Sequence, residues 1–111
     1  MVFITYEEAT ALTEKEQIAL ARQHEPDMGE HIFVIRKDEM LEWTGKYDLG
    51  GWEVYDLTDE VRTWCKDHLN GEWQYRSVLY AQGRSIGADY FLHFVEFGQL
   101  SDAVLFHLKW R

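Results

Sequence analysis

The sequence predicts a single α+β domain, with an antiparallel sheet of three to five strands and two or three helices. Its length of 111 residues fits one domain, and its 46% hydrophobic and 15% aromatic content differs from that of a disordered chain. Segments with strand alternation are interspersed with segments of helical spacing. We see no internal repeat, linker or low-complexity segment, so no second domain is expected.

After a short apolar start, a helix is predicted from about Glu14 to His24. The Thr13-x-x-Glu16 pattern is typical of a capping box, and Pro26 ends the helical pattern. A second cap pattern at Thr5-x-x-Glu8 leaves open a start nearer Tyr6.

The next segments are predicted as a strand and a less regular region. His31–Ile35 is a β-branched and aromatic run that favours a strand. In the region that follows, Asp38–Trp43 fits a helical turn or two, and Lys46–Gly51 fits a loop. The glycine pair in that loop lacks the spacing of a phosphate-binding loop, so no nucleotide site is expected.

The most regular helical spacing follows Trp52–Tyr55, which is predicted as a strand. The helix is expected to begin at Asp56 or Thr58 and to continue to His68, since Asn70-Gly71 ends the pattern.

Trp73–Tyr80 and Ala88–Phe97 are predicted to form a hairpin around a loop at Gln82–Gly87. Apolar residues occupy both sides of the second strand, so its second face must be covered by the N-terminal helix, a partner or another copy.

The final segment, Asp102–Trp110, has two readings. Ser101-Asp102 could cap a helix, whereas the alternation of Val104, Phe106 and Leu108 with polar residues fits a strand. A helix would give residues 52–110 the order βαββα, part of a ferredoxin-like split βαβ arrangement.

The net charge of −9 is unevenly distributed. Residues 1–60 hold 15 Asp/Glu and 5 Lys/Arg, a balance of −10, and residues 61–111 hold 5 and 6, a balance of +1. Such a surface repels phosphate backbones and attracts basic partners, so direct nucleic-acid binding is not expected. The alternative explanation, that the acidic residues serve only to keep the domain soluble, stays open.

The single cysteine, Cys65, excludes an intramolecular disulfide and favours a reducing compartment. We find no signal-peptide pattern and no long apolar segment. We therefore expect a cytoplasmic protein that does not enter the membrane.

Motifs with a chemical role are sparse. Cys65-x-x-His68 lacks further metal ligands, and Cys65 falls on the apolar stripe, so a packed thiol is expected, with no metal and no cofactor. The carboxylates of Glu53, Asp56, Asp59 and Glu60 could hold a divalent cation or act as acid and base. Asp56 and Asp59 are interpreted instead as residues that a helix N-terminus favours. A hydrolase or metal-dependent enzyme that uses His68 or His93 with these carboxylates stays open as an alternative.

Acidic and aromatic residues mix in the irregular middle of the chain. We predict that this segment contacts a basic protein partner, and that the protein is a non-enzymatic binding module. The predicted contact residues are Asp38, Glu39, Glu42, Trp43, Tyr47 and Asp48.

The C-terminal FVEF and SDAVLFHLKWR segments resemble the C-terminal segments of small bacteriophage proteins, in which a strand precedes an Asp-Ala opening and an F-x-L-x-W ending. The resemblance implies a viral origin and no particular site residues. A phage protein of this kind would act in the host cytoplasm, as an inhibitor or regulator of a host protein, for instance a nucleic-acid-binding defence protein. A virion or assembly component that forms a homo-oligomer is the remaining alternative.

Overall fold

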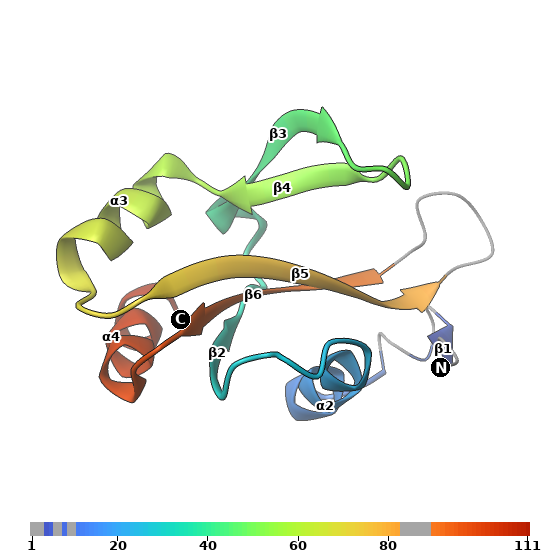
Figure 1. Cartoon of the computed structure of the whole chain (residues 1–111), viewed down its shortest axis with the longest axis horizontal. Helices are drawn as coiled ribbons and strands as arrows, with labels where there is room; N and C mark the ends of the chain where they lie inside the picture. The colour runs from blue at the N-terminus through green and yellow to red at the C-terminus, as the bar shows by residue number, and fades with distance from the viewer. Residues whose placement is uncertain (1–3, 6–7, 9–10, 83–89) are drawn as a thin grey trace.

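Two long strands, β5 (Trp73–Gln82) and β6 (Tyr90–Phe97), pair antiparallel at the centre of the molecule. In this computed structural model, which describes residues 4–5, 8, 11–82 and 90–111, they belong to a four-stranded sheet of order β1-β5-β6-β2. At its edges, β2 (His31–Val34) pairs antiparallel with β6, and β1 (Ile4–Thr5) pairs parallel with β5. Together with the helices, this sheet confirms the predicted α+β class (Figure 1).

One face of the sheet is covered by α2 (Glu14–His24), whose bounds match the prediction. The predicted capping box is present, since Thr13 and Glu16 each accept a hydrogen bond from the other's backbone N–H. Ala21 of α2 packs in a buried cluster with Leu92 and Phe94 of β6. The N-terminal helix is therefore what covers this apolar face.

The opposite face packs against α3 (Asp59–His68) and α4 (Leu100–Trp110). Cys65 and Phe106, one from each helix, are fully buried with Val95 of β6. Leu92 and Val95 lie on opposite faces because strand side chains alternate. One face of the sheet is thus covered by α2, and α3 and α4 cover part of the other face.

The final segment forms a helix, and its alternating pattern was misleading. Phe106 is fully buried in the second core cluster, which is the one that contains Cys65 and Val95. Val104 and Leu108, which a strand would place on the same side as Phe106, are instead 49% and 63% exposed. The expected cap at Ser101-Asp102 is wrong, because α4 begins after Gln99 without a side-chain cap. Asp102 lies inside the first turn and is 2% exposed.

The segment predicted as helical turns and a loop forms most of a hairpin. Only Asp38–Met40 is helical, as the short 3-10 turn η1, and β3 (Leu41–Tyr47) follows it directly. β3 pairs antiparallel with β4 (Glu53–Leu57). Lys46 and Tyr47 of the predicted loop therefore belong to β3, and the turn between the two strands is shorter than the predicted loop.

The hairpin lies apart from the four-stranded sheet (Figure 1). The order β4-α3-β5-β6-α4 is the predicted βαββα order, but β4 pairs with β3. This pairing differs from a split βαβ unit, in which both strands that flank the helix belong to one sheet. Thr58 caps α3, so the later of its two predicted starts is the observed one.

Some of the predictions concern residues that the structure does not describe. The predicted loop at Gln82–Gly87 lies outside the described residues except for Gln82, which ends β5, and Ala88 also lies outside them. The helix start near Tyr6 falls outside them too. In the described part of the chain, no helix has the length and apolar character needed to cross a bilayer.

Candidate functional site

The six predicted contact residues lie along one continuous segment. Asp38 and Glu39 belong to η1, Asp48 belongs to the turn, and the other three, Glu42, Trp43 and Tyr47, belong to β3. All six are exposed. The structure thus brings them onto the hairpin and its approach, although their strand geometry was not predicted.

Trp43 and Tyr47 form an aromatic pair on the hairpin. Their ring centroids are 5.6 Å apart in an edge-to-face arrangement, and the side chains are 48% and 61% exposed. The indole of Trp43 donates a hydrogen bond to the carbonyl oxygen of Lys46, at 3.1 Å. The pair is thus held in place while much of its apolar surface faces solvent.

Arg62 of α3 ties the hairpin to the body of the protein. Its guanidinium lies 3.1 Å from Asp56 of β4, 3.5 Å from Glu42 of β3 and 2.7 Å from Asp59 of its own helix. The hydrogen bond with Asp59 and the charge of Asp56 raise the pKa of Arg62. Asp56 lies in β4 and forms an ion pair with Arg62. Of the two residues predicted at the helix N-terminus, Asp59 lies in the first turn of α3 and Asp56 does not.

Asp48 organises the turn between β3 and β4. Its Oδ1 accepts hydrogen bonds from the backbone N–H of Gly50, at 2.8 Å, and of Trp52, at 3.1 Å. Gly51 has φ of +83°, a left-handed conformation that favours glycine. This tight turn directs Trp52 back toward β6, where its ring centroid lies 5.9 Å from that of Phe91.

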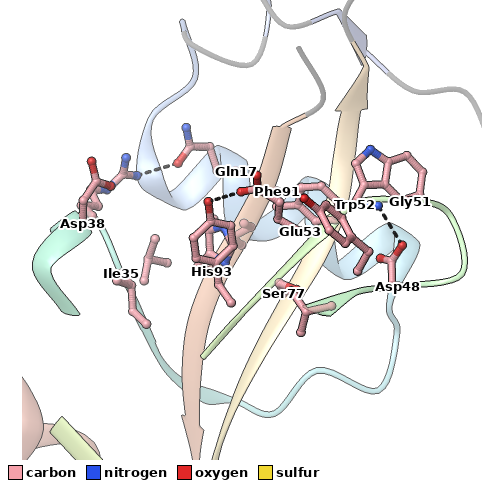
Figure 2. A pocket seen from close by; sticks show the side chains of 16 residues that line it. Gln17, Ile35, Asp38, Asp48, Gly51, Trp52, Glu53, Ser77, Phe91 and His93 are labelled. Carbon is pink, nitrogen blue, oxygen red and sulfur yellow. Dashed lines mark hydrogen bonds between the residues drawn. The ribbon is translucent and has the colours of Figure 1, made fainter. Parts of the chain in front are cut away.

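A pocket of about 820 Å³ lies between the hairpin and the central sheet. Figure 2 shows Asp38 near one end, Trp52 and Asp48 near the other, and Glu53 and Phe91 between them. Aromatic rings form much of its wall, contributed by Tyr47, Trp52, Tyr55, Phe91 and His93. Asp38, Tyr47 and Asp48 are the predicted contact residues that line it, and Glu39, Glu42 and Trp43 do not.

Rings from both walls of the pocket approach one another. The centroid of His93 lies 6.3 Å from that of Phe91 and 6.1 Å from that of Tyr55 on the hairpin. With the contact between Trp52 and Phe91, they form a chain of aromatic contacts across the space between the two sheets. Such ring pairs lie in the range at which aromatic contacts are favourable.

Glu53 places a carboxylate in this aromatic wall. The hydroxyl of Tyr55 donates a hydrogen bond to its Oε2, at 2.6 Å, and this bond raises the pKa of Tyr55. A carboxylate has about four lone-pair sites, so one hydrogen bond leaves further accepting capacity. Glu53 is exposed and lies in β4.

Two partly buried titratable groups meet at the inner wall. The hydroxyl of Tyr75 lies 2.6 Å from Nδ1 of His93. Burial lowers the pKa of His93, against a smaller opposing effect of the Asp38 charge, and burial raises the pKa of Tyr75 to about 12. Both side chains therefore favour their neutral forms near neutral pH.

One cationic group lines the pocket among the described residues, and it has partners. Nε of Arg36 lies 3.1 Å from Glu14, and one of its terminal nitrogens donates to the side-chain oxygen of Gln17, at 2.6 Å. The acidic groups at the pocket are Asp38, Asp48 and Glu53. Its charge is therefore negative on balance.

Cys65 and His68 do not form a reactive pair. Cys65 is fully buried and burial raises its pKa to about 12, whereas His68 is exposed and stacks on Trp64 at 4.6 Å. In the described part of the chain, no three side chains of the His, Cys, Asp or Glu types gather to hold a metal ion.

The chain matches no protein-family model, no curated protein and no solved structure in the comparisons made. Its function must therefore be inferred from its own residues. Trp52, Tyr55 and Phe91 were not predicted from the sequence as binding residues. The high local content of aromatic residues is the one feature of the sequence that could have indicated them. Their proximity depends on how the hairpin folds over β6.

Proposed function

We propose that this protein is a non-enzymatic module that binds a basic surface of another protein through the hairpin β3–β4 and η1. The observation that carries the proposal is the exposed pair Trp43 and Tyr47, set on a strand that also carries Glu42 and follows the acidic turn at Asp38 and Glu39. These five residues are referred to below as the hairpin surface.

The composition of the hairpin surface suits this role. Exposed aromatic side chains supply much of the energy of protein interfaces, because they bury a large area at low entropic cost. Surrounding carboxylates accelerate association with a basic partner and select against acidic ones. Neither Trp43 nor Tyr47 belongs to the buried core clusters. Packing of the core therefore does not explain why these two positions carry aromatic side chains.

The hairpin is also held firmly enough to present a defined surface. A two-stranded hairpin alone is marginally stable in water. Here Leu57 at its base is fully buried and Met40 just before it is 2% exposed, while Arg62 bridges both strands. A partner would therefore meet a preorganised surface, which lowers the entropic cost of binding.

The resemblance of the C-terminal segment to small phage proteins suggests a class of partner. A host protein that binds nucleic acid presents a basic surface, and an acidic protein that occupies this surface would act as its inhibitor or regulator. The proposal places the protein in the host cytoplasm as such an inhibitor, for instance of a defence protein.

A pull-down from bacterial lysate with the full chain as bait tests the proposal. Captured partners should be basic proteins, and raising the salt concentration should weaken the complex because the charges are screened. Capture that does not change with salt, or no capture beyond bare resin, would contradict the electrostatic mechanism.

Matched charge variants sharpen this test. The triple variant Asp38→Asn, Glu39→Gln, Glu42→Gln removes three carboxylates at the hairpin surface, and the control Glu60→Gln, Asp67→Asn, Glu72→Gln removes three exposed carboxylates elsewhere. Only the first should lose the partner. Equal losses would show that net charge, and not this surface, governs capture.

A hydrolase is the second candidate, favoured by one observation: His93 and Glu53 line the same pocket. A neutral histidine can act as a general base, and a carboxylate that lines the same pocket can bind or orient a substrate. His68 lies outside this pocket, so the two histidines provide a matched pair. Hydrolysis of ester or phosphoester substrates that His93→Ala abolishes and His68→Ala retains would support an enzyme, and absence of turnover in the wild-type protein would remove this candidate.

A further inference from the structure

The pocket between the hairpin and the central sheet has a lining suited to a planar cation. Trp52 and Tyr55 of the hairpin side and Phe91 of β6 contribute aromatic rings, and Glu53 contributes a carboxylate among them. The negative ring faces attract cations within about 6 Å of the centroid, and the carboxylate supplies the opposite charge.

We propose that this pocket binds the guanidinium group of an arginine side chain of the partner. The inference rests on the proposed function, because it takes the basic partner as the source of the arginine. It adds a specific anchoring site to the hairpin surface, since Tyr47 belongs to both.

The chemistry of the lining favours guanidinium over ammonium. A guanidinium is planar and weakly hydrated, so it stacks on aromatic rings and loses little hydration in such a pocket. Its fork of N–H donors matches the oxygens of a carboxylate, and Glu53 retains accepting capacity beside its bond from Tyr55. A lysine ammonium is a compact, strongly hydrated charge and matches this lining less well.

The charges that face the pocket agree with a cationic occupant. Asp38, Asp48 and Glu53 are acidic, and the guanidinium of Arg36 is already paired with Glu14 at the end near Gln17. His93 adds no opposing positive charge at neutral pH, because burial lowers its pKa.

The position of Trp52 shows that the pocket wall is built by specific geometry. A Cβ atom on Gly50 would collide with the ring of Trp52, so glycine is required there for the ring to lie where it does. The hydrogen bond from the N–H of Trp52 to Asp48 fixes the same turn. The Trp52 ring is therefore held over the turn and toward Phe91.

Titration of the full chain with N-acetyl-arginine amide, followed by two-dimensional NMR, tests the proposal. The resonances of Trp52, Phe91 and His93 should shift, with a Kd on the order of 1 mM for a single side chain. The isosteric, uncharged N-acetyl-citrulline amide should bind at least about tenfold more weakly, and the lysine compound should also bind more weakly. Equal shifts with citrulline, tighter binding of lysine, or shifts away from these residues would overturn the proposal.

Two variants complete the test. Glu53→Gln should weaken arginine binding about tenfold, and Trp52→Leu should do so through the lost ring, whereas the matched control Glu60→Gln, at an exposed position of α3 outside the pocket, should leave it unchanged. Unchanged arginine binding in both pocket variants would contradict the site. If the arginine compound fails to bind while the triple charge variant of the hairpin surface still loses the partner, the pocket inference fails and the proposed function stands. If the arginine compound binds in the pocket while the triple charge variant keeps the partner, the proposed function alone is contradicted.

Discussion

The hydroxyl of Tyr75 and Nδ1 of His93 lie 2.6 Å apart across β5 and β6, and their rings are nearly parallel, with an interplanar angle of 8°. This contact joins the second core cluster, which Tyr75 flanks, to the wall of the pocket, which His93 lines. Stability and the candidate site therefore share a titratable pair.

The unfolding free energy should decrease as the pH falls below about 6.5. Burial lowers the pKa of His93 in the folded state, so in this range the unfolded chain binds more protons than the folded one, and protonation favours unfolding. Urea denaturation at pH 5 and pH 7 should show this decrease. His93→Asn should reduce the difference between the two values, and Tyr75→Phe, which keeps the histidine buried, should retain it at an overall cost of about 1 kcal/mol.

Glu96 should provide a second, more acidic transition. Burial alone would raise its pKa, but hydrogen bonds from Gly29, Gln74 and Arg76 outweigh that effect and lower it. Its contribution is therefore complete above the unfolded pKa of about 4.3 and is lost as the pH falls through the lower folded value.

The variant Glu96→Gln should cost about 2 kcal/mol at pH 7, because it replaces a charged acceptor of several hydrogen bonds. The difference from wild type should shrink at pH 3, which lies below the unfolded pKa of about 4.3, because protonation of this carboxyl in the unfolded chain reduces its contribution there. The exposed control Glu72→Gln should change stability at pH 7 by less than about 0.5 kcal/mol. A cost for Glu96→Gln that is the same at both pH values would contradict this role.

Asp102 should be the more important residue of the Ser101-Asp102 pair. Its buried carboxylate accepts hydrogen bonds from the backbone N–H of Asn70, at 3.2 Å, and of Gly71, at 2.8 Å, which ties α4 to the loop before β5. Asp102→Ala leaves both donors without this acceptor and should cost about 2–4 kcal/mol by chemical denaturation. Ser101→Ala, at an exposed position, should be nearly neutral, and similar losses in both variants would indicate a simple capping role for the pair.

Cys65 should resist alkylation in the native protein. It is fully buried, and burial raises its pKa to about 12, so neither the thiolate nor access to it is present in the folded state. Labelling by iodoacetamide should therefore follow the rate of unfolding and accelerate in urea. A control with Cys65→Ala and Thr63→Cys places the thiol at an exposed position of the same helix and should react at once. Equally rapid labelling of the wild-type protein would contradict the buried environment.

The sequence by itself determined the features that depend on nearby residues. The capping box of Thr13 and Glu16 spans four residues, so its hydrogen bonds follow from local geometry and set the start of α2. The alternation along Tyr90–Phe97 placed Leu92 and Val95 on opposite faces, since strand geometry requires it. The acidic and aromatic composition of the hairpin surface was also visible in the printed sequence.

Only the tertiary structure decided features that depend on contacts between distant segments. The segment after Met40 became a strand because β4 pairs with it, and Phe106 selected a helix for its segment because it packs between Phe33 and Trp64. The pocket joins Trp52 to Phe91, residues whose proximity no local pattern encodes. Long-range packing outweighs the small propensity differences between helix and strand in short segments, so these choices are made only when the whole chain folds.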